Sequence, residues 1–298
     1  MADYQIFSDG ACDIGKEREK EFDISLIPFY VSLDHEHYFK EIEEISLDVY
    51  YQTILEKKSY PKTSLPSVQD FIDAFRPVLQ EGKDIICTTI TPSLSSSLQS
   101  ATTAKSMLAE EFPNAKIYVV NCWHITGSQS LMLMEMARMK KNGKTIDQVL
   151  EYVEKAKIDA RIHFMVGDLS YLEVGGRIGK LATLSGSILK IKPLIILKGG
   201  EISIGGAVRS RKKGLAKLAE ISKEHFRSTG ENPKDYIAIV GATNIMEEIP
   251  EFEGLLKFAL PTLEFIPSFQ IGATVASHTG PGTIGFCFAK RYEAYNLS

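Results

Sequence analysis

The sequence has little of what marks several classes of protein. Its 298 residues include only four cysteines, Cys12, Cys87, Cys122 and Cys287, with no Cys-x-x-Cys pair. Such scattered cysteines are typical of reduced thiols, so we expect a cytoplasmic protein without a disulfide framework. No apolar run approaches the roughly 18 residues of a membrane span. The N-terminus lacks a basic stretch followed by an apolar one, so no signal peptide is predicted.

An excess of positive charge is also lacking. The formal net charge is −4, so no strongly basic face is expected and binding to nucleic acid is not predicted. Hydrophobic residues make up 44% of the chain and charged residues 24%, which indicates an ordinary globular protein. A chain of 298 residues exceeds one typical hydrophobic core, so we expect two domains.

Two glycine-rich stretches come near to nucleotide-binding motifs and fail them. Gly175 and Gly179 are separated by three residues, and Leu181 follows Lys180, whereas a phosphate loop needs four intervening residues and a Ser or Thr after its lysine. Residues 280–285 match G-x-G-x-x-G, but they lead into an apolar strand at the end of the chain. A dinucleotide fingerprint opens a helix instead. The sequence therefore predicts no nucleotide site.

Two further pairs come near to metal-binding spacing. His35 and His37 could lie on one side of a strand, but no third ligand is nearby and their polar neighbours favour a solvated turn. Cys122 and His124 likewise have no partners at ligand spacing. We therefore predict no metal site.

The order of the predicted elements indicates an α/β fold with two domains. In residues 1–160 strands and helices alternate, which is typical of a parallel sheet with helices on both faces. After residue 160 the pair Gly199-Gly200 predicts a hairpin, which favours a mixed or antiparallel sheet with helices. We place the boundary on this change, giving domains 1–160 and 161–298. The predicted strands cover 4–8, 26–33, 84–90, 116–121, 162–166, 192–197, 236–241, 263–266 and 283–289, and the predicted helices cover 46–57, 67–79, 95–110, 126–141, 145–157, 209–227 and 245–256.

Hydroxyl side chains are the candidate ligand-binding groups. Pro66 pushes the residue before it out of the helical region, so Thr63 and Ser64 are predicted in an extended loop. Ser95 and Ser96 open a helix, where unpaired backbone N–H groups and a partial positive charge suit a carboxylate or a phosphate. Ordinary loop polarity and helix capping are the alternative interpretations of these residues.

A basic cluster precedes the helix that ends near Arg227. Arg209, Arg211, Lys212 and Lys213 lie together at its start. Positive charge at a helix N-terminus opposes the helix dipole. The cluster therefore favours contact with an anion or an acidic partner, and a solvated charged face is the alternative.

Short motifs follow one another along residues 8–288 in an order and spacing that together are specific. They are Ser8-Asp9; Thr63-Ser64 before Pro66-Ser67; Leu94-Ser95 before Gln99-Ser100-Ala101; Tyr171-Leu172 with Gly175-Gly176-Arg177; Lys192-Pro193; the Gly-x-Glu pattern at Gly199 to Glu201; and His278 before Gly280-Pro281-Gly282-Thr283. In this combination the chain resembles the DegV family of bacterial fatty-acid-binding proteins.

The resemblance implies a carrier without catalytic activity or a cofactor. Its ligand would be a long-chain fatty acid such as palmitate, stearate or oleate, held in a tunnel in the first domain with its carboxylate at the domain interface. A separate fatty acid kinase would convert that carboxylate to an acyl phosphate for phospholipid synthesis. The implied carboxylate-binding residues are Thr63, Ser64, Ser95, Ser96, His278, Gly280 and Thr283, and those implied for kinase docking are Arg177, Arg209 and Arg211.

Two positions depart from the family pattern. Ser96-Ser97 stands where members of the family have Gly-Thr, and Leu65 stands where they have Gln. These changes keep the polar anchor and affect the shape of the head-group pocket. The alternative function is a phosphotransferase that acts on a small ligand in the interdomain cleft with Asp9, Thr63 and His278.

Overall fold

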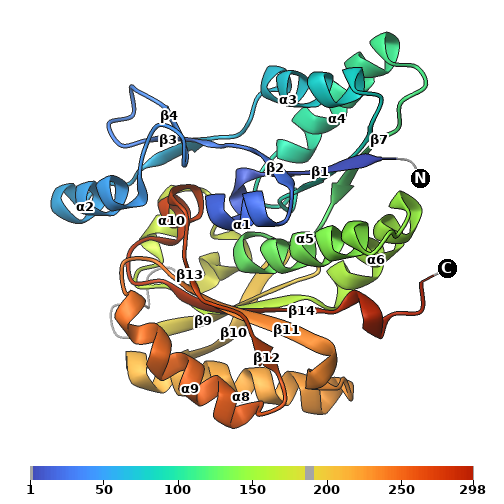
Figure 1. Ribbon diagram of the computed structural model, residues 1–298. Coiled ribbons are helices and arrows are strands. Elements are labelled where there is room, and N and C mark those ends of the chain that lie inside the picture. The colour runs from blue at the N-terminus through green and yellow to red at the C-terminus, as the bar shows by residue number, and fades with distance from the viewer. Residues whose placement is uncertain (1–2, 185–190, 298) are drawn as a thin grey trace.

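A computed structural model describes residues 3–184 and 191–297 of the chain. Two sheets lie one above the other with helices between them and outside them (Figure 1). In this described part, no helix is long and apolar enough to cross a membrane.

The first sheet is parallel throughout. Its strands run in the order β2-β1-β6-β7, with bounds β1 (Tyr4–Asp9), β2 (Ile24–Ile27), β6 (Asp84–Thr89) and β7 (Ile117–Asn121). The helices of this half are α1 (Lys16–Glu21), α2 (Leu47–Lys57), α3 (Val68–Gln80), α4 (Ser97–Glu111), α5 (Thr126–Lys141) and α6 (Ile146–Asp159). Phe71 and Phe75 of α3 pack with α4 in one core, and α5 packs on the other side in a second core. The prediction of a parallel sheet with helices on both faces is confirmed.

The second sheet is mixed. Its strands run in the order β10-β9-β8-β14-β11-β12, and β13 also pairs with β11. Both β12 and β13 lie parallel to β11, and the other pairs are antiparallel. The strand bounds are β8 (Arg161–Met165), β9 (Lys192–Lys198), β10 (Glu201–Val208), β11 (Tyr236–Ala242), β12 (Glu264–Phe265), β13 (Phe269–Gln270) and β14 (Ile284–Lys290). The helices are α7 (Ser170–Val174), α8 (Arg211–Thr229), α9 (Ile249–Ala259) and α10 (Ala273–Thr279).

A small third sheet corrects the sequence prediction for residues 26–33. It contains β3 (Tyr30–Ser32), β4 (Phe39–Lys40) and β5 (Lys62–Ser64), all antiparallel. The single strand predicted there is two strands in two sheets, because β2 ends at Ile27 and β3 begins at Tyr30. Pro28 lies between them and has no N–H to donate to a strand neighbour. The extended conformation predicted for Thr63 and Ser64 is present as β5.

The helix α10 was missed by the sequence prediction. Its residues are mostly β-branched or hydroxyl-bearing, and Ala273 to Ser277 are buried on every side. A short helix that is buried all round has no polar face, so it produces no amphipathic pattern. This helix matters because it brings His278 to the site described below.

The two halves share one core around α5. The second sheet begins at Arg161, close to the change in sequence pattern at residue 160. Nevertheless, the core around α5 includes Ile86 of the first sheet and Ile162 of the second. In Figure 1, α5 and α6 lie between the two sheets, while α8 and α9 cover the far face of the second sheet. The two halves are therefore packed through common helices, and the boundary at residue 160 stays a prediction.

Candidate functional site

The site lies between β1 and β6, where the strand order of the first sheet reverses. From β1 the chain continues to β2 on one side, and from β6 it continues to β7 on the other. In open α/β sheets, ligands bind outside the carboxyl ends of the strands at such a point. Here the carboxylate of Asp9 at the end of β1 accepts a hydrogen bond from the Ile90 amide, 3.0 Å away and just after β6. The helix α4 begins a few residues later, at Ser97.

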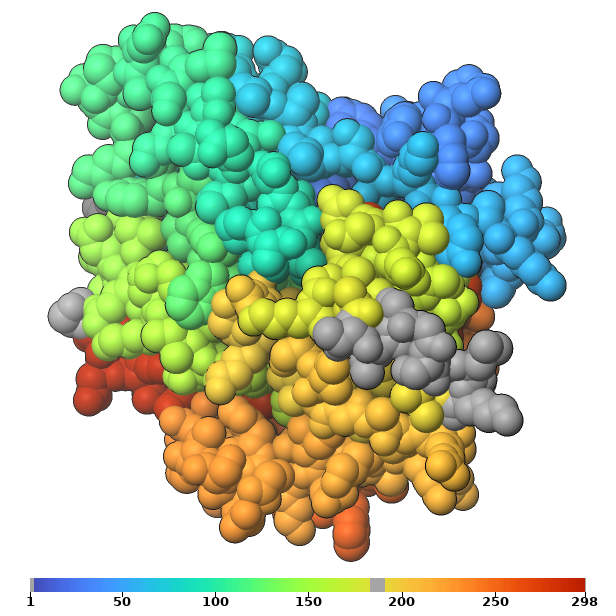
Figure 2. Space-filling model, turned by 180° about the vertical axis from the view of Figure 1, so that it is seen from behind, coloured from blue at the N-terminus to red at the C-terminus, as the bar shows by residue number. Residues whose placement is uncertain are grey.

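A pocket with several polar groups opens beside this point, and we call it the polar pocket. It is lined by Phe29, Thr63, Ser64, Leu65, Ile90, Leu94, Ser95, Ile125, Arg177, Thr274, Val275 and His278. These residues come from both halves of the chain. Figure 2 shows the same meeting on the surface, where the yellow segment around residues 171–180 lies against light-blue and teal segments of the first half. Contacts of Tyr171 with Tyr60, at 4.8 Å between ring centroids, and of Arg177 with Leu94 join the two halves here.

His278 and Thr63 form the central polar contact. Nε2 of His278 lies 2.8 Å from Oγ1 of Thr63, so α10 and β5 meet at this hydrogen bond. Burial lowers the pKa of His278 to about 4, and the positive charge of Arg177 adds to the effect. The imidazole is therefore neutral at neutral pH. Its Nδ1 atom has no hydrogen-bond partner among the described residues. A Cβ at Gly175 would lie 2.3 Å from Nδ1, so only glycine fits beside this histidine.

Ser95 and Ser64 also line the polar pocket, but Ser96 does not. Ser95 is only 8% exposed, and its Oγ accepts a hydrogen bond from the Ser97 amide at 3.3 Å. Ser96 is the exposed N-cap residue of α4 and lines neither this pocket nor the apolar pocket described below. Of the seven residues implied for the carboxylate, four line the polar pocket: Thr63, Ser64, Ser95 and His278.

Arg177 supplies positive charge to the polar pocket. Its Nε donates to the Leu94 carbonyl at 3.0 Å, and its Nη1 donates to the Gly175 carbonyl at 2.6 Å. Gly176, between Gly175 and Arg177, has a φ of 69°, which glycine adopts without strain. In the part of the chain that the structure describes, no acidic side chain forms an ion pair with Arg177. The resemblance implied that Arg177 lies near the carboxylate and serves docking, and the structure places it in the lining of the polar pocket.

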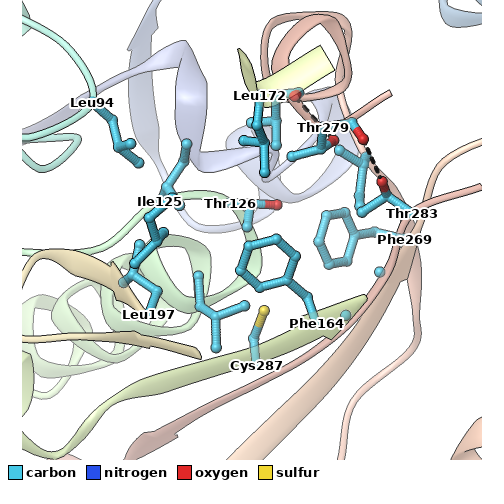
Figure 3. Close-up of a pocket in the computed structure, with 16 residues that line it drawn as sticks. Leu94, Ile125, Thr126, Phe164, Leu172, Leu197, Phe269, Thr279, Thr283 and Cys287 are labelled. Atoms are coloured by element: carbon cyan, nitrogen blue, oxygen red, sulfur yellow. Dashed lines mark hydrogen bonds between the residues drawn. The ribbon is translucent and has the colours of Figure 1, made fainter. Parts of the chain in front are cut away.

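A second pocket adjoins the first, and its lining is almost wholly apolar (Figure 3). This apolar pocket shares Leu94, Ile125 and Val275 with the polar pocket. Its lining is Leu94, Ile125, Thr126, Ile162, Phe164, Leu172, Leu197, Ile202, Gly241, Phe269, Ile271, Val275, Thr279, Thr283, Gly285 and Cys287.

The apolar pocket is not where the tunnel was expected. Only Leu94, Ile125 and Thr126 of its lining come from residues 1–160, whereas the resemblance implied a tunnel in that domain. Strands of the second sheet supply half of the lining, because alternate residues of β8, β9, β11 and β14 point toward α5. Sequence reasoning missed these residues, although their alternation along each strand was visible.

Thr283 and Gly280 hold the end of α10 instead of lining the polar pocket. Thr283 lines the apolar pocket, and its hydroxyl lies 2.9 Å from the Thr279 carbonyl and 3.0 Å from the Gly280 carbonyl. Gly280 has a φ of 74°, and a Cβ there would lie 2.5 Å from the ring of Tyr171. The backbone at this position therefore needs glycine.

The two arginines at the start of α8 line neither pocket. Arg209 is exposed. Arg211 is half-buried; its Nε donates to Glu248 at 2.5 Å and its Nη1 donates to the Gly282 carbonyl at 2.7 Å. Arg211 therefore fixes the loop after α10 to α8, and Arg209 is the arginine of this pair that faces solvent.

The groups named for a phosphotransferase do not meet in one pocket. Asp9 is fully buried and lines neither pocket. Besides Ile90, it accepts a hydrogen bond from Gln129 at 3.1 Å, and burial raises its pKa to about 6. Thr63 and His278 face the polar pocket without it. Among residues 3–184 and 191–297, no cluster of three or more His, Cys, Asp or Glu side chains could hold a metal ion.

The fold and the joined pockets define a class: an α/β protein of two stacked sheets, with a polar site that opens onto an apolar one. The chain belongs to the DegV family, whose family model, described as "Uncharacterised protein, DegV family", matches residues 3–291.

Two solved structures and one further relative support this membership. A stearic-acid-binding protein from Eubacterium ventriosum is 36% identical, with 98% of this chain and 100% of that chain covered and a TM-score of 0.93. A DegV family protein from Thermus thermophilus, described by its fatty acid binding, is 28% identical, with coverage of 97% and 100% and a TM-score of 0.85. A DegV domain-containing protein of Clostridium perfringens is 28% identical over 97% of this chain and 98% of its own length.

Proposed function

We propose that this protein binds a long-chain fatty acid, with the carboxylate in the polar pocket and the acyl chain in the apolar pocket. The observation that carries the proposal is the junction of the two pockets at Leu94, Ile125 and Val275. A molecule that is polar at one end and apolar along its length fits such a junction. The relatives from Eubacterium ventriosum and Thermus thermophilus, which are described as fatty-acid-binding proteins, support the same ligand class.

Three groups suit the carboxylate chemically. A carboxylate accepts hydrogen bonds only, so it needs donors. The hydroxyl of Ser95 and the guanidinium of Arg177 are donors that line the polar pocket. Thr63 becomes a third when Nε2 of His278 donates to it, because the Thr63 hydroxyl hydrogen is then free for the ligand. His278 acts as a positioning residue for Thr63 in this arrangement.

We further propose that the bound acid is presented to a separate fatty acid kinase, so that the protein is a carrier subunit without catalytic activity. The resemblance to the DegV family supports the kinase partner. The burial of Asp9 away from both pockets also fits a carrier, since it leaves Thr63 and His278 without a facing carboxylate base. The preferred ligands are saturated or monounsaturated acids of about sixteen to eighteen carbons, such as palmitate, stearate or oleate, whose buried methylenes supply the binding free energy.

Native mass spectrometry of the purified protein tests the ligand, followed by solvent extraction and lipid identification. The expected result is one co-purifying long-chain fatty acid for each chain. An extract without fatty acid, together with no binding of added palmitate or oleate, would contradict the proposal. Steady ATP turnover by the pure protein, lost on His278→Ala, would contradict the carrier assignment.

A further inference from the structure

One row of residues across the second sheet has an unusual composition. Register pairs place Phe269 of β13 opposite Gly241 of β11, Gly241 opposite Gly285 of β14, and Gly285 opposite Phe164 of β8. Residues that are opposite each other on neighbouring strands point to the same face of a sheet. The row therefore places two glycines between two phenylalanines, and all four residues line the apolar pocket.

The ring of Phe269 fits only because glycines surround it. A Cβ at Gly241 would lie 2.4 Å from Cζ of this ring, so the ring rests directly on the backbone of the sheet. A Cβ at Gly127 of α5 would lie 2.9 Å from Cε1 of the same ring. Phe269 is thus held between a glycine of the sheet and a glycine of the helix that covers it.

Phe269 lies at the end of the apolar pocket that is opposite Leu94. In Figure 3, Leu94, which lines both pockets, is on one side, and Phe269 and Thr283 are on the opposite side. A chain that enters past Leu94 therefore reaches the Gly241–Gly285 pair and the Phe269 ring last. The space that the ring occupies continues the pocket between sheet and helix.

We propose that Phe269 is the end wall of the acyl-chain site and determines the longest acyl chain that the protein accepts. The inference rests on the proposed function, because it presumes a fatty acid in the apolar pocket. Removing the ring leaves a space between Gly241 of the sheet and Gly127 of α5, which further methylenes of the ligand can fill. Adding a methyl group at Gly241 instead pushes the ring toward the bound chain and shortens the site.

Affinities of purified, delipidated protein for fatty acids of increasing chain length test this assignment. Each buried methylene changes affinity about fourfold. Phe269→Ala should therefore increase the affinity for icosanoate relative to hexadecanoate by about tenfold or more. Gly241→Ala should shift preference toward tetradecanoate by about fourfold to tenfold. Phe269→Leu is the milder variant and should shift the preference in the same direction as Phe269→Ala, while placing less demand on folding.

Phe265→Ala is the matched control. Phe265 stacks on Phe286 at 5.9 Å between ring centroids, in the core on the other face of the sheet, and does not line the pocket. It loses a ring of the same size, so it should alter thermal stability and leave the length preference unchanged. Thermal melts of all variants check that each is folded.

The outcomes separate this inference from the proposed function. A wild-type protein that binds fatty acids and folded Phe269 variants with an unchanged length preference would overturn the end-wall role alone. An equal shift in Phe265→Ala would overturn it as well. A wild-type protein that binds no acid in the series would overturn both proposals. A shift confined to the Phe269 and Gly241 variants would support the role.

Discussion

The polar pocket and the apolar pocket are built in different ways. The polar pocket gathers single groups from β5, the start of α4, the turn after α7 and α10, and each group is fixed by one or two hydrogen bonds. Half of the lining of the apolar pocket comes from one continuous sheet face, against which α5 packs. A continuous apolar face buries the acyl chain, whereas the scattered hydrogen-bond donors orient the carboxylate.

The free energies follow the same division. Burying a chain of ~15 methylenes at ~0.8 kcal/mol each offers ~12 kcal/mol before entropic costs. Two hydroxyl hydrogen bonds add ~2–3 kcal/mol. On this account the tail determines affinity, and the head group determines which atoms face a partner.

Shortening the ligand should have the largest effect. Replacing hexadecanoate with octanoate removes eight methylenes and leaves the carboxylate unchanged, so affinity should fall by at least about a thousandfold. Titration calorimetry or competition with a fluorescent fatty acid measures this loss. Hexadecanol, which keeps the tail and loses the charge, is the matched ligand and should lose far less. Equal losses for the two ligands would contradict the division between tail and head.

The polar pocket should also respond to pH through His278. Its pKa is about 4 in the folded protein because it is buried and ordinarily about 6.5 in the unfolded chain. The unfolded state therefore binds a proton first as pH falls, so the free energy of unfolding decreases between about pH 6.5 and pH 4, by up to about 3 kcal/mol from this group.

Denaturation of His278→Gln and of wild type in urea, at several pH values, isolates this contribution. Other titrating groups, Asp9 included, are common to the two proteins and cancel in the comparison. The stability of wild type relative to the variant should decrease as the solution becomes more acidic. Parallel pH profiles would show that His278 is not buried as a neutral group.

Removing one anchor hydroxyl should have a smaller effect on binding. Thr63→Ala and Ser95→Ala should each cost about 1–2 kcal/mol, or roughly tenfold to thirtyfold in affinity. Acyl-phosphate formation with the cognate kinase at saturating lipid should fall further, because an unanchored carboxylate samples unreactive poses. Ser96→Ala, at an exposed neighbour that lines neither pocket, is the control. If affinity and turnover both survive in Thr63→Ala and Ser95→Ala, the anchor lies elsewhere.

The smallest effect is expected at the surface. Arg209→Ala should leave fatty-acid binding intact and weaken coupling to the kinase a few-fold, more at low salt than at high salt. Arg227→Ala, at the other end of α8, is the control because it is also an exposed arginine. Arg211 is unsuitable for this test, since its ion pair with Glu248 holds the loop after α10. Equal kinase-coupled rates at all salt concentrations would argue against docking through Arg209.

The features of this structure that the sequence predicted follow from local sequence patterns. Alternating strands and helices predicted the parallel first sheet, and the Gly199-Gly200 pair predicted the hairpin of β9 and β10 in the second. The extended conformation of Thr63 followed from Pro66. These features depend on residues close together in the chain.

The rest depends on contacts between distant segments. The row of Phe269, Gly241, Gly285 and Phe164 exists only through strand register, which no local pattern specifies. The place of Arg177 in the polar pocket likewise depends on the Leu94 carbonyl, far away in the sequence. The sequence could therefore name individual polar residues, but not the surface on which a ligand tail would lie.

A crystal structure with a fatty acid brominated at its terminal carbon would locate both ends of the ligand, since anomalous scattering marks the end of the tail. The carboxylate is expected within hydrogen-bond distance of Thr63 Oγ1 and Ser95 Oγ, and the bromine is expected in contact with the ring of Phe269. A carboxylate outside the polar pocket, or a bromine outside the apolar pocket, would contradict this expectation.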